Sequence, residues 1–199
     1  MSPSQQPPLR IGMVGAGTVG GGVYEIIMGR LGGSSIHPDP SSPTPPPPSS
    51  VGNPSSRKCV ISKICVRDPS KTRTFHLDTA STTIVTDISE IMDDESIDMI
   101  VEVMGGTTVA KSVVLEGLRR GKSVVTANKA LIAEHLDEIQ RAVVKGGGRM
   151  GLGYESSVCG GIPIIQGLQS CYMGDIIHEV TVSLHSFDPT YWPSRASHV

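Results

Sequence analysis

The sequence predicts an α/β protein built on a doubly wound parallel sheet. Short apolar runs of strand length alternate with helical patterns about a dozen residues long, and a glycine-rich turn joins the first run to the first helix. Such alternation is typical of parallel strands connected by crossover helices. The 199 residues suit one ordinary domain with the beginning of a second.

The first strand is expected at residues 9–14, an apolar run that ends at glycine, as buried parallel strands often do. Residues 1–8 are polar and contain proline, so they are expected to be disordered. A helix should follow the glycine turn. The apolar residues expected on its buried face are Val23, Ile26, Ile27 and Leu31.

Residues 32–57 differ from the rest of the chain because they are rich in Pro and Ser and carry almost no large apolar side chains. Proline removes backbone donors, and such a composition cannot repay the entropy of folding. We expect a disordered or polyproline-like surface insertion. The less favoured alternative is a ligand for an SH3-type domain.

The remaining elements alternate regularly. Strands are predicted at 59–66, 83–85, 97–103, 123–127 and 149–154, and helices at 89–93, 109–120 and 130–145. Gly121 and the run Gly146–Gly148 supply the helix ends, where glycine is favoured.

Composition excludes several classes of function. The net charge is −2 and the pI about 6.3, which argues against binding to nucleic acid or to a membrane surface. The sequence has no apolar run of about 18 residues, which argues against a membrane span. The four Cys form no CxxC pair and the N-terminus resembles no targeting peptide, so a reducing, cytoplasmic location is expected. The six His are scattered, and no transition-metal site is expected.

The glycine turn has the pattern Gly15-x-Gly17-x-x-Gly20 between a strand and a helix. Gly15 permits the tight turn, Gly17 lets the backbone approach a pyrophosphate, and Gly20 lets the helix lie close to the strand. The helix start at Thr18 and Val19 offers free N–H groups and a positive dipole end to the anion. The spacing therefore predicts a Rossmann-type dinucleotide site.

The ribose of such a cofactor should meet the end of the second strand, about 20 residues after the glycines. Asp68 lies 48 residues after Gly20, and without the 26 residues of 32–57 this separation is 22. Asp68 suits the ribose hydroxyls of NAD. Arg67, with Lys71 and Arg73 nearby, suits the 2′-phosphate of NADP. The sequence favours NADP, with NAD as the alternative.

Three segments together resemble the homoserine dehydrogenase family: Ile11–Val23, Val124–Leu131 and Gly153–Ile165. The resemblance extends over residues 9–181. It implies an oxidoreductase that interconverts L-aspartate 4-semialdehyde and L-homoserine with NAD(P)H, on the route to threonine, methionine and isoleucine. The family forms homodimers.

The resemblance also implies roles for individual residues. Lys129, just past a strand end, would contact both cofactor and substrate, where an ammonium group can stabilise the developing alkoxide or protonate it. Gly105 and Gly106 would lie beside the nicotinamide. Thr107 is expected to cap the following helix.

A sodium site would map to the carboxylate of Glu155 and the carbonyls of Val158, Gly160 and Ile162, a donor set that suits a hard cation. Gly161 would border the homoserine pocket. Cys159, at a position where the family often has Gly or Ala, is expected to be a small tolerated residue, not a nucleophile.

The resemblance predicts an NAD(P)-binding domain at 9–155 and the beginning of the catalytic domain at 156–181. It stops after Thr181, and residues 182–199 are an atypical tail. The expectation is a truncated family member that lacks the substrate domain and dimerisation sheet and is inactive alone. The alternative is an NADP-binding module or fragment without catalysis.

Overall fold

The computed structural model describes residues 7–31, 58–147, 150–160 and 162–171. The predicted insertion at 32–57, the atypical tail, Gly161 and most of the predicted disordered N-terminus lie outside these residues. The chain divides into two units, residues 1–164 and residues 165–199.

The first unit contains one parallel sheet whose spatial order is β3-β2-β1-β4-β5-β6. Its strands are β1 (Leu9–Val14), β2 (Cys59–Cys65), β3 (Thr83–Val85), β4 (Met99–Glu102), β5 (Ser123–Thr126) and β6 (Leu152–Gly153). This is the strand order of the Rossmann fold. The prediction of a doubly wound parallel sheet is confirmed.

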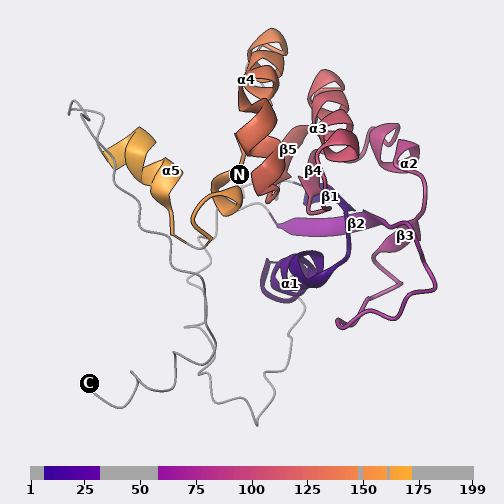
Figure 1. Ribbon diagram of the computed structural model, residues 1–199. Coiled ribbons are helices and arrows are strands. Elements are labelled where there is room, and N and C mark those ends of the chain that lie inside the picture. The colour runs from indigo at the N-terminus through magenta and orange to yellow at the C-terminus, as the bar shows by residue number, and fades with distance from the viewer. Residues whose placement is uncertain (1–6, 32–57, 148–149, 161, 172–199) are drawn as a thin grey trace, which may run out of the picture. The chain divides into compact units, whose positions relative to one another are not determined.

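Helices cover both faces of the sheet. They are α1 (Thr18–Ile26), α2 (Ser89–Met92), α3 (Thr108–Arg119) and α4 (Lys129–Lys145). A π-helical turn (Ile27–Leu31) extends α1. Figure 1 shows α1 on one side of the sheet and α3 and α4 on the other. Because β1 lies between β2 and β4, the two halves wind in opposite directions and leave a crevice at the carboxyl ends of the strands.

Short helical segments follow the sheet: η2 (Glu155–Ser157), α5 (Ile164–Gln166) and η3 (Gly167–Cys171). Within the described part of the chain, no helix is both long and apolar enough to span a membrane.

Two apolar clusters form the core, and neighbouring strand residues alternate between them. Met13 and Val101 belong to the cluster that includes Tyr24 of α1, whereas Val14 and Ile100 belong to the cluster that includes Leu131 of α4. Side chains on a strand alternate between faces, so each strand contributes to both clusters. Burial on both faces explains why these strands appear in the sequence as continuous apolar runs.

The predicted buried face of α1 is wrong at Ile26, whose side chain is 49% exposed. The buried positions of this helix are Gly20, Gly21 and Tyr24. A Cβ at Gly21 would lie 2.7 Å from the Phe75 ring, so this aromatic side chain occupies the space that a larger residue would need. The helix therefore buries two glycines and Tyr24 most deeply, and its aliphatic residue Val23 is only partly buried.

The predicted strands at 59–66 and 123–127 each exceed the observed strand by one residue, and two other predicted strands differ more. Residues 97–103 were expected to be extended, but β4 comprises only Met99–Glu102. Of the strand predicted at 149–154, the structure describes residues 150–154, and of these only Leu152–Gly153 form a strand. Ile97 is nevertheless buried ahead of β4. Its apolar character reflects the core and not the sheet.

Candidate functional site

The turn between β1 and α1 can be built only with glycine at two positions. Gly15 has φ +107°, and a Cβ there would lie 2.7 Å from the Val103 carbonyl oxygen. A Cβ at Gly20 would lie 2.6 Å from the Gly15 carbonyl oxygen. Both contacts are with backbone, which cannot move aside cheaply. The two residues hold the start of α1 close to the ends of β1 and β4.

Gly17 has a different environment, because a Cβ built on it would meet nothing within 4 Å. It occupies the N-cap position of α1, and its carbonyl accepts the first helical hydrogen bond from Gly21 N at 2.8 Å. The preceding N–H groups, those of Thr18, Val19 and Gly20, have no partner within the helix. The open space at Gly17 thus lies next to N–H groups that have no partner within the helix. This cradle fits the pyrophosphate of a dinucleotide.

The turn after β2 is held together by its own polar groups. Asp68 Oδ1 accepts hydrogen bonds from Ser70 Oγ at 2.6 Å and Ser70 N at 2.9 Å, which lower the pKa of this carboxyl group. The Arg73 guanidinium donates to the carbonyl oxygens of Lys71 (2.8 Å) and Asp68 (3.1 Å). Arg67 is exposed, and it forms no ion pair with any described residue. Its guanidinium remains available to a ligand.

The end of β4 carries a carboxylic acid that is fully buried, and the sequence analysis gave it no role. Glu102 Oε2 accepts a hydrogen bond from Thr126 Oγ1 at 2.5 Å, and Oε1 accepts one from Met104 N at 2.9 Å. Burial raises the pKa of Glu102, and these hydrogen bonds partly oppose the shift. The only signal in the sequence is an acidic residue at the end of an apolar run.

Asn128 connects the start of α4 to the turn after β4. Its Oδ1 accepts from Leu131 N at 3.1 Å, which makes it a helix N-cap, and its Nδ2 donates to Gly106 O at 2.7 Å and Met104 O at 3.4 Å. Its own N–H donates to Thr126 Oγ1 at 3.1 Å. The N-cap preference for Asn could have identified this residue from the sequence.

The predicted glycines of the turn after β4 are exposed. A Cβ at Gly105 or Gly106 would meet no atom within 4 Å, and Gly106 has φ +82°. Thr107 occupies the N-cap position of α3, but its side chain makes no capping hydrogen bond. The predicted capping hydrogen bond of Thr107 is therefore wrong, and α3 begins at Thr108, one residue before the predicted start.

Lys129 is the first residue of α4, is exposed, and follows the carboxyl end of β5. The first turn of α4 contains no acidic residue, so this cation faces the positive end of the helix dipole unaided. Such placement costs about 0.3–1 kcal/mol. The ends of parallel strands place Lys129 at the same edge of the sheet as the glycine turn.

The predicted cation ligands lie on one short loop after β6. Glu155 begins η2, and its carbonyl accepts from Val158 N at 3.0 Å. Cys159 and Gly160 both have left-handed backbones, with φ of 53° and 62°. The Ile162 carbonyl already accepts from Ile164 N at 2.8 Å. The described residues contain no cluster of three His, Cys, Asp or Glu side chains that could hold a metal.

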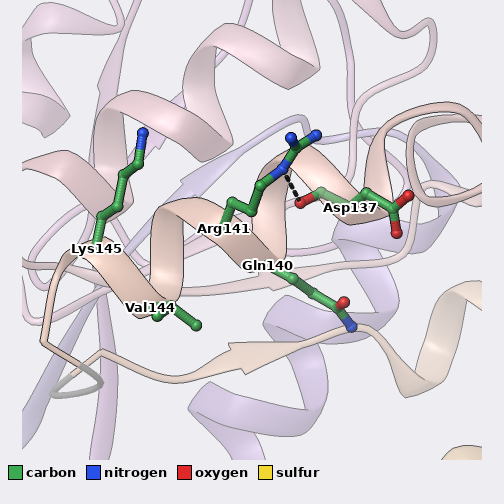
Figure 2. A pocket seen from close by; sticks show the side chains of 5 residues that line it. All are labelled: Asp137, Gln140, Arg141, Val144 and Lys145. Atoms are coloured by element: carbon green, nitrogen blue, oxygen red, sulfur yellow. Dashed lines mark hydrogen bonds between the residues drawn. The ribbon is translucent and has the colours of Figure 1, made fainter.

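The structure has two notable hollows, one bordering these loops and one distant from them. A cavity of about 300 Å³ runs under α1 and is lined mainly by apolar side chains, among them Val23, Val103 and Val125. Figure 2 shows a larger, open depression of about 670 Å³ along the second half of α4, where Arg141 Nε donates to the Asp137 carbonyl oxygen at 3.0 Å. The cavity under α1 reaches the strand-end loops, because Val19 of the glycine turn and Ser156 of η2 also line it, whereas none of their residues lines the depression along α4. The candidate site is therefore defined by the strand-end loops.

Comparison with known proteins finds a single family over most of the chain. The family described as "Homoserine dehydrogenase, NAD binding domain" matches residues 15–151. The homoserine dehydrogenase of Pseudomonas aeruginosa is 33% identical over 163 residues, which are 81% of this chain and 32% of that protein. The Bacillus subtilis homoserine dehydrogenase is 33% identical over 169 residues, 85% of this chain and 34% of that protein.

Solved structures give the same result. The Staphylococcus aureus homoserine dehydrogenase crystal structure at pH 7.5 matches with a TM-score of 0.61 and 32% identity, covering 76% of this chain and 34% of that one. The homoserine dehydrogenase from Thiobacillus denitrificans matches with a TM-score of 0.62 and 29% identity, covering 84% of this chain and 34% of that one. The chain spans about one third of the length of these relatives.

Proposed function

The chain belongs to the homoserine dehydrogenase family, and we propose from this that its strand-end loops hold the nicotinamide cofactor of an enzyme that interconverts L-aspartate 4-semialdehyde and L-homoserine. The observation that carries the proposal is the cradle at Gly17. It leaves room for a pyrophosphate where a Cβ would stand, and it lies between two glycines that the backbone requires. The pathway to threonine, methionine and isoleucine and the cytoplasmic location are part of the same proposal.

The preferred cofactor is NADP. The Oδ1 atom of Asp68 already accepts two hydrogen bonds within its own turn, which makes it a poorer partner for a ribose hydroxyl. The turn after β2 contains three cationic residues, Arg67, Lys71 and Arg73, and one carboxylate, Asp68, so it carries a net positive charge. The guanidinium of Arg67 can pair with a 2′-phosphate in a bidentate manner.

When bound, the nicotinamide exchanges a hydride with the carbon of the aldehyde or alcohol. Reduction also requires a proton on the developing alkoxide, and Lys129 has the chemistry to stabilise that charge or to supply the proton. A cation held against the helix dipole at this strand end supports the assignment, because the position is unfavourable for stability alone.

Sodium binding is proposed on the chemistry of the donor set. One carboxylate and several backbone carbonyls suit a hard cation. Glu155, Val158 and Gly160 share a short loop, which would let them act together. Homoserine would bind next to this loop, with Gly161 at its border.

The cofactor assignment is tested by titrating the purified 199-residue chain with NADPH and with NADH, following the fluorescence of the reduced nicotinamide. Arg67→Ala should weaken NADPH binding by about 1–3 kcal/mol and leave NADH binding nearly unchanged. Arg141→Ala, which removes the same charge from an exposed site on α4, is the control. Equal losses for the two cofactors in Arg67→Ala would remove this residue from the phosphate site.

Catalysis is tested separately, by NADP reduction with homoserine. Hydride transfer needs the substrate carbon within about 3–3.5 Å of the nicotinamide. Since the chain spans one third of its relatives, we predict little turnover by these 199 residues alone. A fusion after Thr181 to the remaining part of the B. subtilis relative should be active, and Lys129→Ala should abolish most of that activity. An inactive fusion that binds NADPH would favour the non-catalytic module.

A further inference from the structure

We propose that Glu102, Thr126 and Asn128 act together as positioning residues that fix the turn at residues 104–106 relative to Lys129. We refer to these three side chains as the Glu102 brace. The inference rests on the proposed cofactor function, because the brace would orient the two loops expected to face the nicotinamide end. Nothing in the brace needs to touch the substrate.

The hydrogen bonds of the brace have a defined direction. Thr126 Oγ1 accepts from the backbone N–H of Asn128 at 3.1 Å, so its own hydrogen is free to point to Glu102 Oε2 at 2.5 Å. The other carboxyl oxygen accepts from Met104 N at 2.9 Å. Glu102 therefore serves twice as an acceptor, which suits a carboxylate.

Asn128 completes the connection with its side-chain amide. The Nδ2 group binds the carbonyls of Met104 and Gly106, while Oδ1 caps α4 through Leu131 N. The brace thus connects the ends of β4 and β5, the turn after β4 and the first turn of α4. All of these segments lie at the carboxyl edge of the sheet, where ligands bind in open α/β folds.

A buried carboxyl group is a costly way to achieve packing. Glu102 has no exposed surface, and it forms no ion pair within the described part of the chain. Burial of such a group is unfavourable unless strong hydrogen bonds compensate for it. A glutamine that kept an oxygen on Met104 N would point its NH₂ group at Thr126 Oγ1, so the threonine hydrogen would lose its acceptor on residue 102. The carboxyl group of Glu102, by contrast, can accept both hydrogen bonds at once, so every donor in the brace keeps its acceptor.

Apart from Met104, which packs against the core, the turn that the brace holds has little other support. Gly105 and Gly106 are exposed and have open space where side chains would be. Lys129 follows Asn128 directly, so the brace sets the separation between this turn and the lysine. Loops that are fixed before binding lose less entropy when a ligand arrives.

The test compares Thr126→Val, which keeps the side-chain shape but removes the hydroxyl group, with Thr126→Ser, which restores it. Dissociation constants are measured for NADPH and for adenosine 2′,5′-bisphosphate, which lacks the nicotinamide half. Thr82→Val is the matched control. Thr82 is also buried and donates to the Ile61 carbonyl at 2.7 Å. It immediately precedes β3, so it lies at the amino end of that strand and away from the carboxyl ends where the brace lies.

Thr126→Val should raise the dissociation constant of NADPH about 10-fold and change that of the adenosine fragment by less than about 2-fold. Thr126→Ser should bind NADPH as tightly as the wild-type chain does. Thr82→Val should lower the melting temperature without changing either constant. If Thr126→Val weakens both ligands equally, or weakens neither, the brace is only structural and the inference is wrong.

If Thr126→Val fails to fold, Glu102→Gln, which has the same shape, replaces it in the comparison. Two outcomes with the wild-type chain are also decisive. A wild-type chain that binds the adenosine fragment but gains nothing from the nicotinamide half would overturn the brace alone. A wild-type chain that binds neither ligand would overturn the proposed function itself.

Discussion

Replacing Gly17 with alanine should separate cofactor binding from folding. The substitution adds one methyl group where a Cβ meets no protein atom within 4 Å. The backbone of Gly17, with φ −81° and ψ −160°, is accessible to alanine. The main cost to folding is that alanine is a poorer N-cap than glycine, worth about 1 kcal/mol or less. The melting temperature should fall by no more than about 2–4 °C.

The effect on binding should be larger, because the added methyl group stands where the pyrophosphate would meet the N–H groups of α1. Loss of one hydrogen bond to a charged group costs about 1.5–3 kcal/mol. This corresponds to NADPH binding that is about 10- to 150-fold weaker.

The assay pairs a fluorescence titration with a thermal melt, and Gly22→Ala is the control. Gly22 is also an exposed glycine of α1 with no atom within 4 Å of an added Cβ, but it lies outside the glycine pattern. Alanine in this helix interior should stabilise the fold by about 0.5–1 kcal/mol and leave the dissociation constant unchanged.

Unchanged NADPH affinity in Gly17→Ala would refute the reasoning, since the cofactor would then not approach this turn. Equal losses of affinity in Gly17→Ala and Gly22→Ala would also refute it, because the effect would then belong to the helix as a whole. Unfolding of Gly17→Ala would contradict the open space around this residue.

Two predictions concern stability. Gly117→Ala should lower the free energy of unfolding by about 1–3 kcal/mol, because the new Cβ would lie 2.7 Å from Ile100 Cδ1. Urea unfolding measures this change, and a gain in stability would show that α3 shifts freely. Burial raises the pKa of Glu102 above its ordinary value of 4.5, so the folded protein retains a proton that the unfolded chain releases. This contribution to stability falls as the pH rises from about 4.5 through the raised pKa. The wild-type minus Glu102→Gln difference in unfolding free energy should therefore decrease over that range, and a flat difference would contradict the shift.

The fold was largely predictable because parallel strands buried on both faces are apolar throughout. The run at residues 9–14 gave the limits of β1, and Lys145 was correctly expected as the last residue of α4. The packing of α1 was not predictable in the same way. Its buried face depends on Phe75, a residue of a distant loop that occupies the space beside Gly21. Helical periodicity contains no information about such a partner.

The candidate site also has a part that could be predicted from the sequence and a part that could not. Gly15 and Gly20 could be identified from the sequence because a side chain at either position would clash with nearby backbone, and the spacing of the glycine pattern reflects this requirement. Glu102 could not, because a glutamate at the end of a strand is usually solvated. Its burial depends on Thr126, which is 24 residues away in the sequence. Networks that join separate strand ends emerge only when the strands are placed side by side.

The outer strands of the sheet are both short. β3 has three residues and β6 has two, at opposite edges. An edge strand can recruit a strand from another molecule through its unpaired N–H and C=O groups. In the part of the chain that the structure describes, an incoming strand would find very few such groups on either edge. Neighbouring molecules therefore gain little by extending this sheet, and its lateral growth into an aggregate is disfavoured.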